Sequence, residues 1–364
     1  MRITNLREAV QIKTLCVVFG GLSGEHEVSL RSATLVLKEV DREAFSVVML
    51  GITKNGRWLM YDGPLELIES GGWESSGQTR PAVISPDRGH GGIFLPEENK
   101  AVPLDVVFGV LHGEGGEDGT LQGLLELAGI PYVGCGVLSS ALCMDKAVSH
   151  ELLVAAGIPK TGLIAVNKGD DGDFSALEAR LARELGYPMF VKPSNTGSSV
   201  GVSRARNPGE LKGAIDFAFK YGNKLVVERE VKGQEVECAV MGELEPIAAE
   251  SLGEIVPEDF YSYDAKYLDD SASLIVPARL GGETAQKIKT LAKKAYRVLC
   301  CRGFARVDFF VREDGEIILN EINTIPGFTS ISMFPRLFAE GGLSGRELVA
   351  RLIDMARCDS PRHS

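Results

Sequence analysis

The sequence predicts an α/β protein built from three lobes. Short apolar strands alternate with helices through the first third of the chain, which is typical of a parallel sheet with both faces covered. Strand and helix patterns recur in the middle third, and an apolar hairpin followed by two helices closes the last third. We therefore expect three domains, covering residues 1–145, 146–234 and 235–364.

In the first lobe, a glycine-rich turn follows the first apolar strand and opens a helix that we expect to reach about Val40. Residues 63–99 are rich in Gly, Ser and Pro and predict an irregular segment. Helical periodicity over residues 139–156, with Ser139 or Ser140 as N-cap, predicts a helix. The strands of this lobe are expected at residues 14–19, 46–52 and 105–111.

The middle lobe continues the alternation of strands and charged helices. The expected strands are residues 162–166, 188–192 and 225–231, and the expected helices lie near residues 175–185 and 208–219. Between the second strand and the second helix lies a loop of small residues, SNTGSSVG. Such a loop can bring several backbone N–H groups close to one ligand.

The last lobe opens with two strand-like runs, VECAVMG and EPIAAES, and then has a polar, aromatic loop at residues 257–270. A long helix is expected near residues 284–300. A hairpin follows, because the apolar runs at 304–311 and 316–323 are joined by Glu-Asp-Gly, which suits a tight turn. The last two helices are expected to be capped near Ser330 and Ser344.

Bulk composition excludes some classes of partner. The formal net charge is −11 and no long run of Lys or Arg occurs, which argues against nucleic acid or an anionic membrane as the main partner. The seven cysteines are scattered without CxxC spacing, which predicts reduced thiols rather than disulfides or a zinc site. No secretory signal and no apolar stretch of about 18 residues is found, so we expect a soluble, cytoplasmic protein.

The predicted hairpin carries the first candidate site. Glu321 and Asn323 share a strand face, and Asp308 joins them if the register of the two strands allows it. Two carboxylates and a carboxamide suit Mg²⁺, which prefers oxygen ligands. A solvated hairpin end is the alternative, although apolar neighbours make unpaired carboxylates costly there.

A second candidate site follows the strand at 188–192. Lys192 ends that strand, and the loop after it could wrap a phosphate with its N–H groups and the hydroxyls of Ser198 and Ser199. The spacing is not that of a Walker A loop. Taken alone, a flexible surface loop explains the same residues.

Three further loops carry polar groups. His112 lies in a glycine-dense turn before a helix that opens near Thr120, whose amides could help to hold an anion, although a lone His in a turn is usually a surface residue. In GGLSGEHEVS, Glu25 and Glu27 would repel a pyrophosphate, so a carboxylate here fits a ligand's ammonium group better. FYSYDAKY, which contains Lys266, is either a surface loop or a lid that closes over reactants.

These motifs together resemble the D-alanine–D-alanine ligases of the ATP-grasp superfamily. They occur in the order GGLSGEHEVSL, LHGEGGEDGTLQGLLEL, GIPYVG, MDK, VKPSNTGSSVGVS, FYSYDAKY, ARVD and NEINTIPGFTSISM, and span the chain from about Leu15 to Met355. The resemblance implies an ATP-grasp architecture: a Rossmann-like parallel α/β lobe on the substrate side, then two α+β lobes that sandwich ATP. It also implies that residues 257–270 form a lid.

The resemblance further implies roles for individual residues. Lys146 and Lys192 match the lysines that contact the ATP phosphates, Glu228 matches the residue that meets the adenine amino group, Val231 a backbone contact to adenine, and Glu235 the ribose ligand. Ser198, Ser199 and Lys266 complete the implied ATP site, and Asp308, Glu321 and Asn323 match ligands of two Mg²⁺ (or Mn²⁺) ions.

On the substrate side, the matched residues surround two D-alanine molecules. Glu25 matches the partner of the first ammonium group, His112 lies beside the first carboxylate, and Ser198 and Tyr267 match groups hydrogen-bonded to Glu25. Arg306 and the Gly327 amide match oxyanion stabilisers, Lys266 and Ser332 match groups that hold the second carboxylate and the phosphoryl group, and Met333 borders the second subsite.

The implied activity is ATP-dependent joining of two D-alanines through D-alanyl phosphate, for peptidoglycan precursor synthesis. The family also suggests a homodimer and K⁺ as an activator. Ligases that take D-lactate or D-serine as second substrate are the nearest alternative, and DAKY with Tyr267 favours D-alanine. More distant alternatives are an ATP-grasp ligase of other specificity and a nucleotide-binding regulatory protein with an inactive site.

Overall fold

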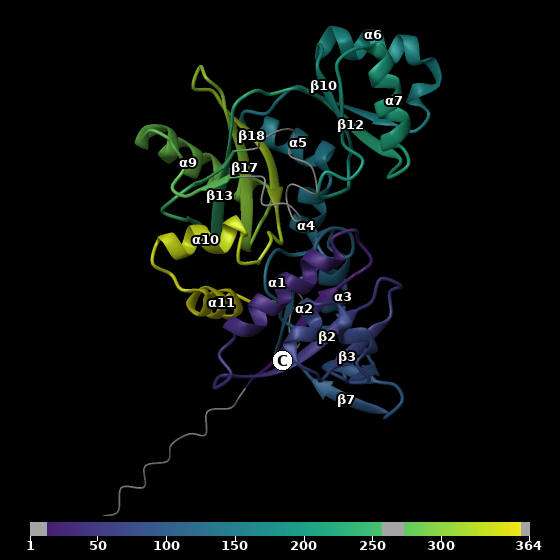
Figure 1. The fold of residues 1–364 in the computed structure, drawn as a ribbon, viewed down its shortest axis with the longest axis vertical. Helices are drawn as coiled ribbons and strands as arrows, with labels where there is room; N and C mark the ends of the chain where they lie inside the picture. Colours follow the sequence, from purple (N-terminus) through teal and green to yellow (C-terminus); the bar gives the residue numbers. More distant parts are fainter. Residues whose placement is uncertain (1–12, 257–272, 358–364) are drawn as a thin grey trace, which may run out of the picture.

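The computed structural model describes residues 13–256 and 273–357. Three bodies of secondary structure surround a common centre: purple and blue elements at the bottom of Figure 1, teal elements at the upper right, and green to yellow elements at the left. Each body has its own sheet, of five, four and six strands, and the first carries an additional three-stranded sheet. This is a mixed α/β fold, as the sequence predicts.

The first sheet has a parallel core and an antiparallel edge. Its parallel strands are β1 (Lys13–Gly20), β2 (Phe45–Ile52) and β8 (Val106–Gly109). Two strands that the sequence did not predict, β3 (Trp58–Tyr61) and β4 (Thr79–Pro81), extend it antiparallel, in the order β4-β3-β2-β1-β8. Helices α1 (His26–Glu39) and α3 (Thr120–Ala128) accompany this sheet.

The expectation of an irregular segment at residues 63–99 was wrong. Besides β4, it holds α2 (Leu65–Glu69), a 3₁₀ turn (Gly72–Ser75), β5 (Val83–Ile84) and β6 (Gly92–Leu95), and β6 pairs with β5 and with β7 (Lys100–Pro103). Apolar anchors explain this order: Trp73 is fully buried, and its ring lies 5.1 Å edge-on from Phe19. Gly, Ser and Pro therefore mark turns between short elements.

The helix expected at residues 139–156 is broken in two. Helix α4 (Val137–Met144) ends before Asp145, whose ψ of 100° leaves the helical region, and α5 (Lys146–Ala155) starts directly after it. The Asp145 side chain accepts hydrogen bonds from Ala147 N and Val148 N, both at 3.1 Å. Aspartate is a strong N-cap and a weak interior helix residue, so the break lies at Asp145.

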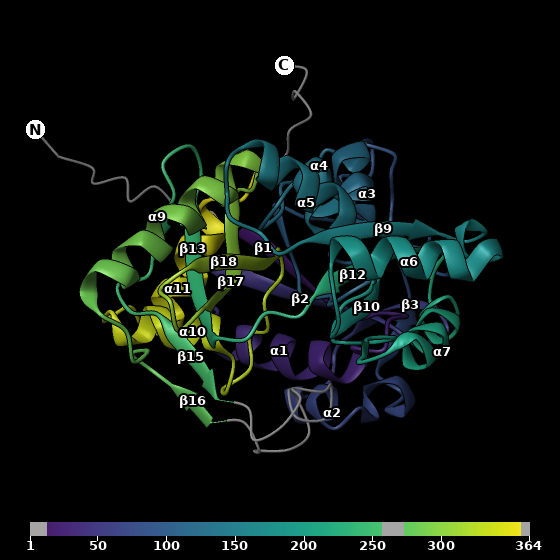
Figure 2. The same cartoon turned by 90° about the horizontal axis from the view of Figure 1, so that it is seen from above.

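The middle sheet is antiparallel, in the order β11-β10-β12-β9. Its strands are β9 (Leu163–Asn167), β10 (Met189–Pro193), β11 (Ser203–Ala205) and β12 (Lys224–Arg229). Helices α6 (Phe174–Glu184) and α7 (Pro208–Ala218) close a separate core with this sheet. Figure 2 shows these elements standing apart from the six-stranded sheet.

The last sheet runs β16-β15-β13-β17-β18, with β14 paired to β13. Its strands are β13 (Gln234–Gly242), β14 (Ile247–Ala248), β15 (Gly253–Val256), β16 (Ser273–Ile275), β17 (Gly303–Val311) and β18 (Ile317–Asn323). The apolar face of α9 (Gly282–Val298) packs on this sheet. The hairpin expected between β17 and β18 is confirmed.

The two C-terminal helices join the last body to the first. Helix α11 (Gly345–Asp354) contacts α1 and shares a core with it, and it starts at Ser344, which forms a capping box with Glu347. Helix α10 (Met333–Glu340) has Ser332 as N-cap, so the expected cap near Ser330 is displaced by two residues. The Ser332 hydroxyl is held instead by Thr329, whose N–H donates to it at 2.9 Å.

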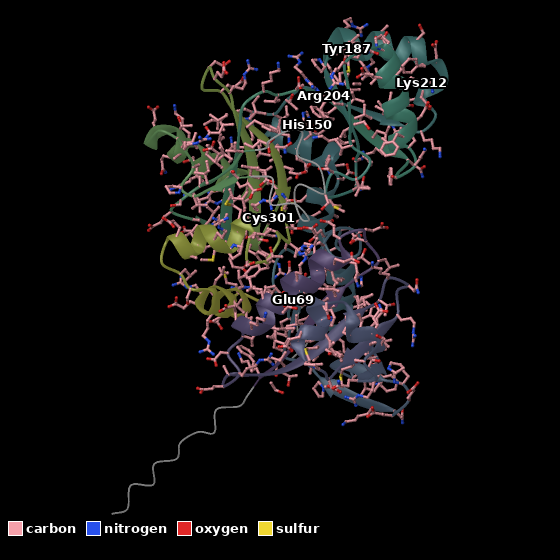
Figure 3. All side chains as sticks on the ribbon, in the orientation of Figure 1. Glu69, His150, Tyr187, Arg204, Lys212 and Cys301 are labelled. Atoms are coloured by element: carbon pink, nitrogen blue, oxygen red, sulfur yellow. The ribbon has the colours of Figure 1, made fainter. Side chains whose placement is uncertain are left out.

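Two further observations concern the described ranges as a whole. Within residues 13–256 and 273–357, no helix is long and apolar enough to cross a membrane. The six cysteines in these ranges are free thiols. Two of them, Cys143 and Cys301, have their sulfur atoms 3.7 Å apart, where α4 meets the last body (Figure 3).

Candidate active site

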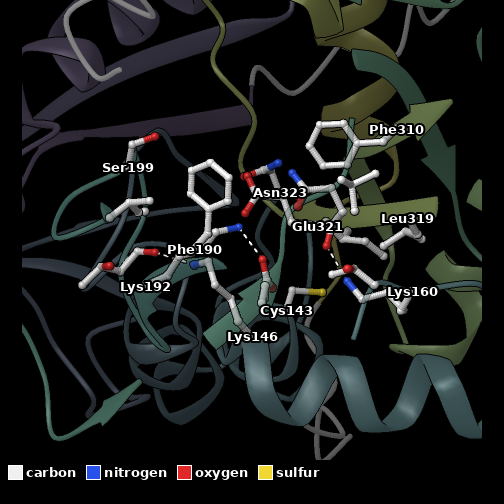
Figure 4. A pocket seen from close by; sticks show the side chains of 18 of the residues that line it. Cys143, Lys146, Lys160, Phe190, Lys192, Ser199, Phe310, Leu319, Glu321 and Asn323 are labelled. Carbon is white, nitrogen blue, oxygen red and sulfur yellow. Dashed lines mark hydrogen bonds and ion pairs between the residues drawn. The ribbon is translucent and has the colours of Figure 1, made fainter. Parts of the chain in front are cut away.

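Two adjoining cavities lie where the three bodies meet. The larger, of about 310 Å³, lies between the strands β10 and β12 on one side and β18 on the other (Figure 4). The smaller, of about 100 Å³, lies between the first and last bodies. Five residues line both cavities: Glu117, Gly197, Ser198, Glu321 and Asn323. A ligand in one cavity would therefore be within reach of a ligand in the other.

Three lysines, Lys146, Lys160 and Lys192, line the larger cavity. Lys192 Nζ contacts Glu228 Oε2 at 2.6 Å across neighbouring strands, and Lys146 Nζ donates to Thr196 O at 2.6 Å. Burial opposes the charge of Lys192, but the Glu228 carboxylate prevails and raises the lysine pKa. Burial would likewise raise the pKa of Glu228, yet Lys192 and Lys160 lower it. Both groups are therefore charged.

Flat apolar side chains form the far walls of the same cavity. Phe190 and Phe310 lie on opposite sides of it in Figure 4, and Val231 and Glu235 also line it. Aromatic walls together with lysines and hydrogen-bonding carboxylates suit a purine nucleotide. The structure thus brings together the residues that the sequence assigned to ATP: Lys146, Lys192, Ser198, Ser199, Glu228, Val231 and Glu235.

The Gly/Ser loop adopts an unusual backbone conformation between the two cavities. Ser198 and Ser199 have φ values of 47° and 59°, in the left-handed region that non-glycine residues seldom occupy. Such strain typically costs about 1–3 kcal/mol and persists where surrounding structure enforces it, often at ligand sites. Here the Ser198 hydroxyl donates to Glu25 Oε1, across a sequence separation of 173 residues.

Glu25 is buried against two glycines. A Cβ atom on Gly113 would lie 2.7 Å from Glu25 Oε2, and one on Gly197 would lie 2.9 Å from the same oxygen. Both distances are under 3.0 Å, so a side chain at either position would force the Glu25 carboxylate to move, and glycine lets the loops approach it. Glu25 lines the smaller cavity together with Arg306. The predicted contact between Glu25 and Ser198 is present. The whole of the expected lid at 257–270, with Lys266 and Tyr267, lies outside the described residues.

His112 contacts the backbone of a distant loop through one ring nitrogen. Its Nδ1–H donates to Ile325 O at 3.0 Å, while Nε2 accepts from the Ser32 hydroxyl at 3.0 Å. The Ser32 oxygen in turn accepts from Phe328 N at 3.1 Å. Burial lowers the pKa of His112, so the ring is neutral in this arrangement. His112 lines the smaller cavity as expected, but its nitrogens hold the loop that carries Gly327.

Sequence reasoning missed Glu117. Its carboxylate accepts hydrogen bonds from Gly113 N at 2.9 Å and Ile325 N at 3.0 Å. Burial, and then the nearby Glu25 carboxylate, raise the pKa of Glu117 to about 8. The sequence offers one indication of a role for Glu117: HGEGGEDG carries three acidic residues, which is unusual for a glycine-rich turn that leads into a helix.

The register of β17 and β18 brings the expected metal ligands together. Asp308 pairs with Glu321, and Asn323 Nδ2 donates to Asp308 Oδ2 at 2.9 Å. Arg306 holds Asp308 through Nε at 2.8 Å and Nη2 at 2.7 Å. The described ranges contain no cluster of three His, Cys, Asp or Glu side chains placed for a metal, so a third oxygen would come from the Asn323 carboxamide. The metal role stays a prediction.

An extra residue in β18 decides which side chains face the cavities. Asp308 pairs with Glu321 but Phe309 pairs with Leu319, so Asn320 is a β-bulge. Before the bulge, odd-numbered Ile317 and Leu319 pack in the α9 core; after it, even-numbered Ile322 does so. This change of side places Glu321 on the same face of the sheet as Asp308.

The remaining expected substrate residues gather around the smaller cavity. Arg306, Gly327, Ser332 and Met333 all line it. A Cβ atom on Gly327 would lie 2.7 Å from Ser332 Oγ, so this turn also depends on glycine. Met333 is buried, and the first turn of α10 holds it against Gly253.

Comparisons with known proteins agree with this geometry. Family models described as D-ala D-ala ligase N-terminus and C-terminus match residues 14–135 and 152–354. A D-alanine–D-alanine ligase of Acetivibrio thermocellus is 48% identical over 360 residues, covering 94% of this chain and 96% of the relative.

Solved structures resemble the chain over nearly its full length. The VanG D-Ala:D-Ser ligase from Enterococcus faecalis has a TM-score of 0.86 at 40% identity, covering 95% of this chain and 99% of that one. The D-alanine–D-alanine ligase from Coxiella burnetii has a TM-score of 0.83 at 33% identity, covering 94% and 95%. The expected ATP-grasp architecture is thereby confirmed, and the chain belongs to the D-alanine–D-alanine ligase family.

Proposed function

We propose that this protein joins two D-alanine molecules to D-alanyl-D-alanine with the conversion of ATP to ADP and phosphate, for peptidoglycan precursor synthesis. One observation carries the proposal: a lysine-rich cavity of nucleotide size opens onto a small cavity that is walled by a buried carboxylate, Glu25, and a guanidinium, Arg306. An amino acid presents an ammonium and a carboxylate, which these two groups match in charge.

The first chemical step is activation of the carboxylate of the first D-alanine. A free carboxylate is a poor electrophile, so a carboxylate oxygen attacks the γ-phosphorus of ATP, the bond to ADP breaks, and an acyl phosphate forms. This step brings two anions together, so positive charge must surround the phosphates. Lys146 and Lys192 supply that charge, while Glu25, oriented by Ser198, pairs with the ammonium group.

The second step forms the peptide bond. The free amine of the second D-alanine attacks the acyl carbon, and a tetrahedral oxyanion develops before phosphate leaves. Preorganised donors lower the free energy of such an oxyanion. Arg306 and the Gly327 N–H are the donors we assign, and Ser332 binds the second substrate's carboxylate, next to Met333. Lys266 and Tyr267, by family resemblance, cover the reactants from the loop at 257–270.

The oxygen donors of the hairpin fit two Mg²⁺ or Mn²⁺ ions. Asp308 and Glu321 face each other in register, and the Asn323 carboxamide lies beside Asp308, a set that suits hard divalent cations. Bound there, the ions would neutralise phosphate charge. Arg306 donates to both carboxylate oxygens of Asp308 and so holds that side chain in place. A K⁺ activator, a homodimeric state and a cytoplasmic location follow from the family resemblance and belong to the proposal.

A second candidate function is ligation of D-alanine to D-serine, because the VanG structure is a D-Ala:D-Ser ligase with a TM-score of 0.86. The 48% identical relative, a D-alanine–D-alanine ligase, favours D-alanine. The two candidates differ at the second subsite, which Met333 borders.

Product analysis separates these candidates. Protein, ATP and Mg²⁺ are incubated with D-alanine alone, L-alanine alone, and D-alanine with D-serine or D-lactate, and the nucleotides and dipeptides are identified by mass spectrometry. We expect ADP and D-alanyl-D-alanine from D-alanine alone. Equal turnover of L-alanine, or AMP as a product, would contradict the proposal; a preference for the mixed product would establish the second candidate.

A further inference from the structure

Lys160 is a lysine of the larger cavity that the proposed reaction does not use. It lies at the start of the middle body, beside Leu319 in Figure 4, and it lines the cavity together with Lys146 and Lys192. Its Nζ donates to the backbone carbonyl of Asn320, the extra residue of the β18 bulge. Lys160 thus connects the middle body to the strand that carries Glu321.

Residues 159 and 160 contact two successive residues of β18 on the side away from β17. Leu319 N donates to Pro159 O at 2.9 Å, and the next residue, Asn320, accepts through its carbonyl from Lys160. In a regular strand, the polar groups of successive residues face opposite neighbours. Here the N–H of Leu319 and the C=O of Asn320 both face residues 159–160. This is the backbone signature of the bulge, and the carbonyl of its extra residue accepts from Lys160.

The bulge matters because it sets the direction of Glu321. Without the extra residue, the positions after Asn320 would shift to the opposite face of the sheet, since the side-chain period of a strand is two residues. Glu321 would then turn toward the α9 core and Ile322 toward the cavity. Burying a carboxylate among apolar side chains is costly, so a complete change of register is unfavourable. Loss of the contact that fixes the bulge would instead let the bulge relax or move along β18.

The surroundings of Lys160 act on its charge in both directions. Burial, and to a smaller extent Lys192 and Lys146, lower the pKa of Lys160, while the carboxylates of Glu228 and Glu321 raise it; the net result is a fall from 10.5 to about 8. At neutral pH the ammonium form therefore still predominates, and it donates to the Asn320 carbonyl.

We propose that Lys160 is a positioning residue for the metal-binding carboxylate: by holding the Asn320 carbonyl it fixes the bulge and keeps Glu321 beside Asp308. The inference rests on the proposed function in one respect, which is that Glu321 binds a divalent cation. Groups that orient a metal ligand typically change metal affinity about 10- to 100-fold when they are removed.

The test measures binding rather than turnover. Binding of Mn²⁺ to the protein with saturating ADP is titrated by electron paramagnetic resonance, and binding of ADP in EDTA is titrated by calorimetry. In Lys160→Met, whose side chain is uncharged and shorter by one atom, we expect Mn²⁺ affinity to fall about 10-fold or more. Metal-free ADP affinity should change much less. Lys160→Arg keeps a charged donor and should restore most of the Mn²⁺ affinity.

Two controls make the outcomes distinct. Lys287→Met removes an exposed lysine of α9 that pairs with Glu283, so it should leave both affinities unchanged. Glu321→Gln tests the metal ligand itself.

If Glu321→Gln weakens Mn²⁺ binding but Lys160→Met does not, the inference about Lys160 is wrong and the proposed function stands. If Glu321→Gln does not change the Mn²⁺ affinity, Glu321 is not a metal ligand, and both the metal assignment and the inference about Lys160 are wrong. If Lys160→Met weakens ADP in EDTA but not Mn²⁺, Lys160 contacts the nucleotide instead, which also overturns the inference. Should Lys160→Met not fold, a normal Mn²⁺ affinity in Lys160→Gln would overturn it as well.

Discussion

Glu117 and Ile325 are 208 residues apart in the sequence, yet Ile325 N donates to Glu117 Oε1 at 3.0 Å. The carbonyl of the same Ile325 accepts from His112 Nδ1 at 3.0 Å. The turn that contains His112 and Glu117 therefore binds both the N–H and the C=O of Ile325, a residue of the last body. That residue lies two positions before Gly327, whose N–H we assign to the oxyanion, so the turn fixes the oxyanion donor.

Replacement of Glu117 by Gln should damage this arrangement. The two carboxyl oxygens of Glu117 accept from Gly113 N and Ile325 N, one each, whereas a carboxamide has one acceptor oxygen and would turn an N–H₂ group toward the other donor. Leaving a buried donor unsatisfied costs about 1–3 kcal/mol. We expect lower kcat with a smaller change in KM for ATP, measured by steady-state ADP release. Unchanged kcat in a folded variant would refute the positioning role.

The same residue should make stability depend on pH. The pKa of Glu117 rises from its ordinary value of 4.5 to about 8 in the folded protein, chiefly through burial. A carboxyl with a raised folded pKa favours the folded state below its unfolded pKa, and this contribution is lost as pH rises through the folded pKa. Between about pH 4.5 and 8, the free energy of unfolding of the wild type should therefore fall relative to Glu117→Gln. Urea denaturation of both proteins across this range checks the sign; parallel curves would show an ordinary pKa.

The close approach of Gly197 to Glu25 predicts a selective defect in Gly197→Ala. The added Cβ would lie 2.9 Å from Glu25 Oε2, so the carboxylate or the loop must move. We expect weaker binding of the first D-alanine, seen as a higher KM for D-alanine, with ADP affinity nearly retained. Gly123→Ala is a matched control, because its Cβ would meet nothing within 4 Å. Equal effects of the two variants on KM for D-alanine would contradict the role of Glu25.

Lys192→Ala should weaken ATP binding. It removes a charge beside the assigned phosphate position and leaves the Glu228 carboxylate without its partner at 2.6 Å. A lost charged hydrogen bond costs about 1.5–3 kcal/mol, which corresponds to roughly 10- to 150-fold in affinity. Calorimetric titration with ADP measures this directly, and Lys212→Ala, an exposed lysine of α7, is the control. Equal affinities in the two variants would mean that Lys192 has no contact with nucleotide.

Local sequence patterns predicted much of the fold, and their failures have identifiable causes. The hairpin of β17 and β18 follows from two apolar runs around Asp-Gly, and it placed Asp308 beside Glu321 as expected. The helix expected at 139–156 failed at Asp145, where side-chain capping of Ala147 and Val148 overrides continuous periodicity. The segment at 63–99 failed because Trp73, buried against the first sheet, organises elements too short for a periodic signal.

The candidate site was predictable as a set of residues but not in its supporting contacts. Motifs supplied Glu25, Ser198 and Arg306, all of which line the cavities. The roles of Glu117 and Lys160 depend on contacts with Ile325 and Asn320, more than 150 residues away, and on a bulge that sequence alternation alone does not fix.

The central claim is that a D-alanine carboxylate is phosphorylated before the peptide bond forms. D-Alanine labelled with ¹⁸O in both carboxylate oxygens tests it most directly, with the released phosphate analysed by mass spectrometry. If the acyl phosphate forms, one carboxylate oxygen leaves with the phosphoryl group, so each dipeptide should be accompanied by one singly labelled phosphate. Unlabelled phosphate together with labelled dipeptide would contradict the account.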